Sequence, residues 1–175
     1  VGLGWHEAKP AKRGLFAPKP APIDCDASAI MLIDGKLREN GDVIFFNNLR
    51  HKSGTVQHMG DTLTGAGEGD DEQIEIELEK VPANVEKIAF TVTIYDADVR
   101  KQNFGQVNNA FIRIYNEANG EEMLRYDLGE DFSIETAVVV GELYRHNGEW
   151  KFNAIGSGFQ GGLAALCGHY GIEVA

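Results

Sequence analysis

Cysteines, basic residues and long hydrophobic runs are all scarce in this chain. Cys25 and Cys167 are the only cysteines, too few for a disulfide framework, and neither lies at a spacing that strongly indicates zinc. The 16 Lys and Arg against 27 Asp and Glu give a formal charge of −11, which disfavours binding to a phosphate backbone. No apolar run approaches the roughly 20 residues that span a bilayer, and the first five residues do not resemble a signal peptide. We therefore expect a soluble, cytoplasmic protein that does not bind nucleic acid.

Chain length and hydrophobic content indicate one domain over residues 1–175. The 175 residues are 43% hydrophobic, which is enough for a single core. Residues 7–22 contain four of the five prolines and a local excess of Lys and Arg, which argues against a helix or a central strand. We expect an extended loop or arm there.

From Ile23 onward, short apolar or alternating runs are separated by turn residues, which is typical of an antiparallel all-β domain. In one run Ile74, Ile76 and Leu78 alternate with acidic residues, so one face of that strand is expected to be buried. The predicted strands are Asp24–Ile33, Asp42–Phe46, Gln73–Glu79, Lys87–Tyr95, Ala110–Asn116, Glu122–Leu128, Ala137–Arg145 and Trp150–Ile155.

Two Asn-Gly pairs and one alanine-rich segment complete the predicted fold. Asn119-Gly120 and Asn147-Gly148 each lie between two strand-like runs, where a tight hairpin needs positive φ angles. Within Gly161–Tyr170, Ala and Leu replace the alternation and favour a short C-terminal helix. The sequence therefore predicts an antiparallel β-sandwich followed by a helix.

The segment Gly60–Glu72 is the most unusual part of the chain, because it holds four glycines, five carboxylates and no base. The carboxylates would repel one another if they folded together without a counter-charge. Calcium takes 6–8 oxygen ligands in flexible geometry, which a glycine-rich acidic loop can supply. A solvated acidic turn is the alternative.

A second acidic cluster begins a predicted strand. Asp24 and Asp26 are two residues apart, so their side chains are expected on one face. Asn47 and Asn48 could add amide oxygens, although Asn pairs also form turns.

One motif outside these clusters suggests a different ligand. Residues 156–161 match G-x-G-x-x-G, follow a predicted strand and precede a helical segment. The remaining residues leave no room for a returning parallel strand, so we favour a glycine-rich turn over a dinucleotide site. The five histidines do not cluster in sequence, and a Ser-His-Asp triad could form only through the fold.

Several segments resemble the TerD family of tellurium-resistance and stress proteins. They are Val1–Trp5, Asp24–Ala29, Asn47–Leu49, Gly60–Gly65, Gly69–Ile74, Asn103–Val107, Gly141–Arg145 and Gly161–Ala164. The resemblance implies a two-sheet β-sandwich akin to C2 domains that binds two calcium ions, and a role beside other tellurium-resistance proteins near the inner membrane face. It also implies that the family's first strand is missing before Val1.

The calcium ligands are inferred from the resemblance, residue by residue. They are Asp24, Asp26, Asp61, Asp70, Asp71 and Glu72, with the carbonyl of Gly67 and the amides of Asn47 and Asn48. The chain departs from the family at His6, Thr62, Ala66 and Glu68.

We interpret the chain as a calcium-binding module of a bacterial stress response, without its own catalysis. Two alternatives remain open at this stage. One is an enzyme that uses the acidic loop to hold a catalytic metal. The other is a module that docks on membranes when calcium is bound.

Overall fold

The computed structural model describes residues 1–7, 21–61, 69–128 and 132–172. The strands are β1 (Gly2–Glu7), β2 (Cys25–Leu32), β3 (Val43–Ile44), β4 (Val56–His58), β5 (Glu72–Ile76), β6 (Lys87–Ile94), β7 (Val107–Asn116), β8 (Glu121–Asp127), β9 (Ala137–His146) and β10 (Glu149–Phe159). The helices are α1 (Ala97–Arg100) and α3 (Gly162–His169), and 3₁₀ turns cover Asn40–Asp42, Leu78–Lys80 and Phe104–Gln106.

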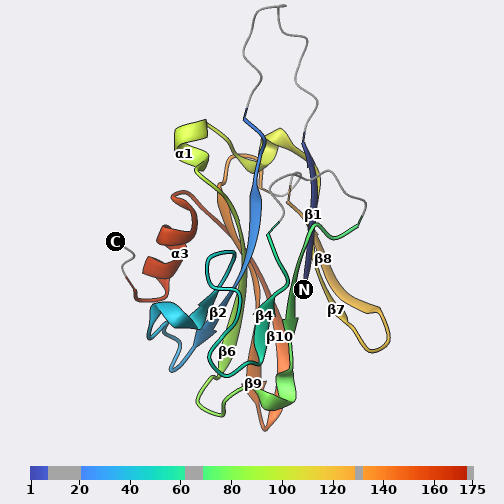
Figure 1. Ribbon diagram of the computed structural model, residues 1–175, viewed down its shortest axis with the longest axis vertical. Helices are drawn as coiled ribbons and strands as arrows, with labels where there is room; N and C mark the ends of the chain where they lie inside the picture. Colours follow the sequence, from blue (N-terminus) through green and yellow to red (C-terminus); the bar gives the residue numbers. More distant parts are fainter. Residues whose placement is uncertain (8–20, 62–68, 129–131, 173–175) are drawn as a thin grey trace, which may run out of the picture.

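The strands form two antiparallel sheets that face each other (Figure 1). The first sheet has the order β4-β5-β1-β7-β8, and the second has the order β10-β9-β6-β2-β3. Every registered pair among the described strands is antiparallel. The predicted all-β sandwich with a C-terminal helix is therefore confirmed.

The main core lies between the sheets, and a second core lies under α3. Trp5 from β1 and Phe90 from β6 are fully buried between the sheets. On the outer face of the second sheet, Ile30 and Val139 pack against Leu166 of α3. Figure 1 shows α3 lying along this side of the sandwich. Because both faces of the second sheet are covered here, all eight residues of β2 are buried.

The two faces of β2 differ in a way that places the polar residues. Odd-numbered Cys25, Ala27 and Ala29 point into the core between the sheets, as expected from the two-residue period of a strand. The even-numbered side chains therefore lie on the outer face, where Asp26 and Ser28 precede Ile30. The outer face of β2 is thus polar at its start and apolar toward α3.

Some predicted elements differ from the structure. The strand expected at Gln73–Glu79 ends at Ile76 and continues as a 3₁₀ turn at Leu78–Lys80, whereas the one expected at Asp42–Phe46 shortens to β3. Strands β1 and β4 and helix α1 were not predicted. Most of the proline-rich segment 7–22 lies outside the described residues.

The two Asn-Gly turns both close hairpins, but with different geometry. Asn147 and Gly148 have φ angles of 51° and 78°, so both central residues are left-handed as a two-residue hairpin requires. In the β7–β8 hairpin, Asn116 pairs with Glu121 and only Gly120 has positive φ. That turn is therefore a longer loop. No helix among the described residues is long and apolar enough to cross a bilayer.

Candidate metal centre

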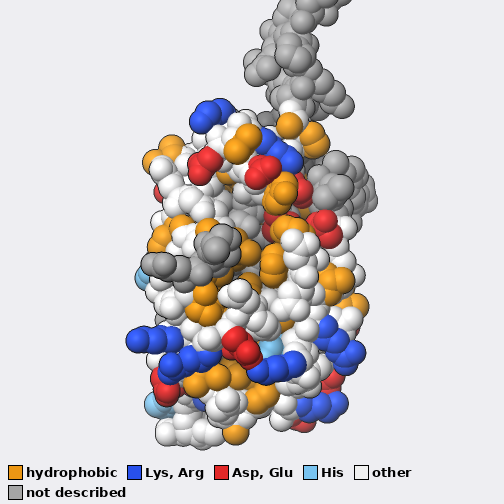
Figure 2. Space-filling model, turned by 60° about the vertical axis from the view of Figure 1, so that its left-hand side comes forward, with side chains coloured by type: hydrophobic (Ala, Val, Ile, Leu, Met, Phe, Trp, Pro, Cys, Tyr) orange, Lys and Arg blue, Asp and Glu red, His pale blue; other side chains and the backbone are white. Residues whose placement is uncertain are grey.

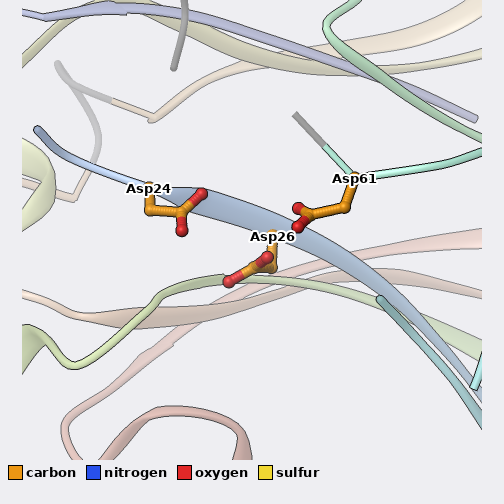
Figure 3. A group of neighbouring side chains, drawn as sticks. All are labelled: Asp24, Asp26 and Asp61. Atoms are coloured by element: carbon orange, nitrogen blue, oxygen red, sulfur yellow. The ribbon is translucent and has the colours of Figure 1, made fainter. Parts of the chain in front are cut away.

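Three carboxylates meet beside the start of β2. Asp24 precedes the strand, Asp26 lies within it, and Asp61 comes from the segment that follows β4 (Figure 3). One carboxylate oxygen from each lies within 4.8 Å of the others. Asp24 is 7% exposed and Asp26 is 4% exposed, whereas Asp61 is open to solvent. We call Asp24, Asp26 and Asp61 the acidic trio.

Burial and mutual repulsion disfavour the charged forms of the two buried members. Desolvation, reinforced by the charges of Asp61 and Glu72, raises the pKa of Asp24 to about 6. Desolvation together with Glu72 and Asp24 raises the pKa of Asp26 to about 8. Arg100 opposes both shifts without overcoming them. The trio is therefore an electrostatically unfavourable arrangement that a cation would relieve.

Glu72 lies beside the trio and joins the two sheets. Its Oε2 accepts a hydrogen bond of 2.9 Å from the backbone N–H of Ala27 and lies 3.3 Å from Nε2 of His58. The side chains of Glu72 and His58 are both fully buried. Since the N–H of Gly60 donates to Nδ1 of His58, the Nε2 of this histidine carries the proton that faces Glu72.

The next two carboxylates of the acidic loop make other contacts. Asp70 forms a two-point ion pair with Arg113 of β7, with both N···O distances 2.8 Å. Asp71 accepts a 3.0 Å hydrogen bond from the backbone N–H of Trp5. These residues fasten the loop to β7 and β1, and their role as calcium ligands stays a prediction.

The remaining predicted ligands lie apart or outside the described residues. Asn48 donates from Nδ2 to the carbonyls of Val43 and Gly41, at 2.7 and 3.3 Å, so its amide closes the turn after β3. Asn47 is exposed in the same turn. Gly67, with the departures at Thr62, Ala66 and Glu68, lies outside the described residues.

Sequence reasoning placed Glu72 in the loop and missed that it is buried. Glu72 lies two residues before Ile74, so the alternation of β5 puts both on the inner face. That signal was present in the sequence. His58 and Arg113 carried no comparable signal, because each meets its carboxylate only through the fold.

The glycine motif at residues 156–161 ends an antiparallel strand. β10 pairs antiparallel with β9, with a bulge between Ala154 and Ser157, and Gly161 with φ of 104° precedes α3. A dinucleotide fold needs a parallel βαβ unit at this motif. The glycine-rich turn expected at residues 156–161 is therefore wrong for most of the motif, because β10 continues through a bulge to Phe159 and only Gly161 lies at the helix start.

Asp42, His51 and Ser53 form a hydrogen-bonded chain, the type of Ser-His-Asp arrangement that the sequence could neither predict nor exclude. His51 lies 3.2 Å from Asp42 through Nε2 and 2.7 Å from the hydroxyl of Ser53 through Nδ1. The backbone N–H of Ser53 also donates to Nδ1, and its hydroxyl contacts Thr55. These bonds stabilise the turn before β4.

Comparison with known proteins gives matches along the whole chain. The TerD domain matches residues 1–170. General stress protein 16U of Bacillus subtilis (strain 168) is 56% identical over 99% of this chain and 87% of its own length. Tellurium resistance protein TerD of Serratia marcescens is 53% identical over 100% of this chain and 88% of its own length.

A solved structure shares the fold. The homologue of telluride resistance protein (TerD) SCO6318 from Streptomyces coelicolor A3(2) superposes with a TM-score of 0.76 over 95% of this chain and 92% of its own. Its sequence identity is 22%, so this likeness concerns the fold alone.

Proposed function

Since the chain belongs to the TerD domain family, we propose that it is a calcium-binding module of a bacterial stress response of the tellurium-resistance type. Its relatives are named as tellurium-resistance and stress proteins. These names do not specify a ligand. The support for calcium comes from the side chains of the acidic trio.

The observation that carries the proposal is the state of Asp24. Its Oδ1 is buried and has no hydrogen-bond partner among the described residues, although it lies beside two further carboxylates. A buried carboxylate oxygen without a partner is costly. The donor set consists of carboxylates, which suit a hard cation such as calcium.

Asp24, Asp26 and Asp61 would hold the ion directly. An ion there supplies two positive charges where the fold gathers three carboxyl groups. Glu72 adjoins this group. The remaining proposed ligands are Asp70, Asp71, Gly67, Asn47 and Asn48. Two ions would change the formal charge from −11 to −7, with the whole change at one end of the sandwich.

We further propose that the module acts by binding rather than by catalysis. It would work in the cytoplasm, beside other tellurium-resistance proteins near the inner membrane face. The tellurium-resistance names of its relatives support only the link with such proteins. Ordering of the acidic end by calcium would create the surface that such partners recognise.

The test is calorimetric titration of calcium into protein freed of divalent ions. The parent is expected to bind calcium in preference to magnesium, because magnesium demands near-ideal octahedral geometry and sheds water reluctantly. Asp26→Asn should abolish the strongest binding, whereas Asp34→Asn, whose side chain is 81% exposed, should leave it unchanged. Equal affinity for magnesium, or unaltered binding in Asp26→Asn, would overturn the proposal.

A further inference from the structure

A hollow of about 630 Å³ opens on the outer face of the second sheet. It lies between α1, the start of α3 and the turn after β3, on the side of the molecule that faces the viewer in Figure 2. Its size is within the range of small-molecule sites. The hollow shares Asp26 with the acidic trio, but the rest of its lining takes no part in the proposed calcium site.

The hollow contains two hydroxyl groups that the fold leaves without partners. Ser28 is 1% exposed and Thr136 is 6% exposed, and both line the hollow. Neither hydroxyl oxygen has a hydrogen-bond partner among the described residues. Buried hydroxyls are normally hydrogen-bonded, so these two indicate a ligand that supplies polar hydrogens or accepts them.

The charge of the lining indicates the sign of that ligand. Asp26 lies in the buried part of the hollow, and the exposed residues Asp96 and Asp98 of the α1 segment lie at its rim. No Lys, Arg or His occurs among its described lining residues. The start of α3 contributes a partial positive charge of about one half, and the guanidinium of Arg100 lies beside Tyr95. Together these charges are smaller than those of Asp26, Asp96 and Asp98. The hollow therefore favours a cation over an anion.

Aromatic rings line the same space and suit an organic cation. Phe46 packs edge-on against Tyr95 at 5.8 Å between ring centres, and Phe45 packs against Phe46 at 5.2 Å. Tyr95 already attracts a cation of the chain itself, because the guanidinium of Arg100 lies 5.2 Å from its ring centre. Leu163 of α3 adds aliphatic surface.

We propose that this hollow binds an aliphatic polyamine. An ammonium group has three donors and no acceptor, which matches the free hydroxyls of Ser28 and Thr136. The methylene chain would lie on Phe46 and Leu163, and carboxylates both inside and at the rim match a ligand charged at both ends. A bare metal ion would leave the apolar walls and most of the volume unused.

Titration of spermidine and putrescine into the folded protein, followed by calorimetry, tests this inference. Both amines are expected to bind, whereas 1-butanol, which has the chain without the charge, should not. Thr136→Val removes a hydroxyl and Asp96→Asn removes a rim charge, and each should weaken spermidine binding about tenfold or more. Glu149→Gln removes an exposed charge outside the lining and should leave the affinity unchanged.

The variants separate this inference from the calcium proposal, because neither Thr136 nor Asp96 belongs to the acidic trio. Both should still bind calcium like the parent. Retained spermidine affinity in Thr136→Val and Asp96→Asn, with melting temperatures showing that both are folded, would mean that polyamines bind the acidic surface in general and would overturn the inference. Nα-acetyl-lysine methylamide imitates a lysine side chain of a protein. If this compound binds and putrescine does not, the hollow recognises a protein lysine and the inference is overturned.

Discussion

Arg113 holds both carboxylate oxygens of Asp70, with Nε 2.8 Å from one and Nη2 2.8 Å from the other. The hydrogen bonds to Asp70 raise the pKa of Arg113 above its ordinary value. The same guanidinium lies 4.6 Å from the ring centre of Tyr115. This pair fixes the end of the acidic loop to β7, so Asp70 has a structural task that its place in an acidic sequence did not reveal.

Asp70→Asn is expected to destabilise the protein by about 2 kcal/mol, because a two-point bond to a charged group is lost from a mostly buried position. Calcium affinity at the acidic trio should change less than in Asp26→Asn. Urea unfolding and calorimetric titration measure the two effects. Arg113→Leu serves as the partner variant, and a loss of calcium binding in Asp70→Asn alone would show that Asp70 is also a ligand, as the family resemblance implies.

Asp24→Asn should raise the melting temperature of the calcium-free protein, because one of three repelling carboxylates is removed. The same change should reduce the gain that calcium gives the parent, which is about 2.7 kcal/mol for one site at 100 times the dissociation constant. Thermal unfolding with chelator and with excess calcium measures both. If the variant gains as much from calcium as the parent does, Asp24 does not bind the ion.

The calcium-free protein is expected to lose stability as pH rises from about 4 to about 8. The pKa of Asp26 is about 8 and that of Asp24 about 6 in the folded state, both raised from 3.8, so the folded chain binds protons more tightly than the unfolded chain in this window. Other titrating groups are common to the parent and Asp26→Asn. Urea unfolding at pH 5.5 and 8.5 should therefore show a smaller decline in the variant, and equal declines would contradict the raised pKa of Asp26.

Gly4→Ala should destabilise the fold by about 1–3 kcal/mol through overpacking. A Cβ at Gly4 would lie 2.4 Å from the carbonyl oxygen of Gly69 and 2.6 Å from Phe111, and the backbone atom cannot rotate away. Gly41→Ala is the control, since a Cβ there meets nothing within 4 Å. Comparable unfolding curves for the two variants would show that the loop at Gly69 yields.

The long strands could be predicted because burial imposes a readable pattern. β2, β6 and β9 lie within one or two residues of their predicted bounds, since runs of apolar and β-branched residues suit a sheet covered on both faces. β1 could not be predicted because glycines such as Gly2 and Gly4 are uncommon in strands. In the fold, their missing side chains leave room for Asp70 and for the backbone of Gly69. β4 and α1, with three and four residues, are too short to show a period.

Only two of the three residues of the acidic trio could be predicted from the sequence to lie together. The spacing of Asp24 and Asp26 places both on one face, and the structure brings them together. Asp61 joins them through the path of the chain after β4, which no local pattern specifies. The sequence also carried no sign that the hydroxyls of Ser28 and Thr136 have no hydrogen-bond partner in the described part of the chain, because such partners come from neighbours distant in sequence.

The first half of β2 has no neighbouring strand on one side, because β3 pairs with it only at Ala29 and Ile30 among the described residues. A bare strand edge is a template for pairing with another chain, and charged side chains along the edge are one defence against it. Glu72 accepts the hydrogen bond from the backbone N–H of Ala27, so this group cannot pair with another strand. Asp24 and Asp26 add charge along the same segment. We therefore expect Asp24 and Asp26, which repel each other in the calcium-free fold, also to oppose pairing with another chain, so variants that neutralise these two residues should gain thermal stability and lose solubility.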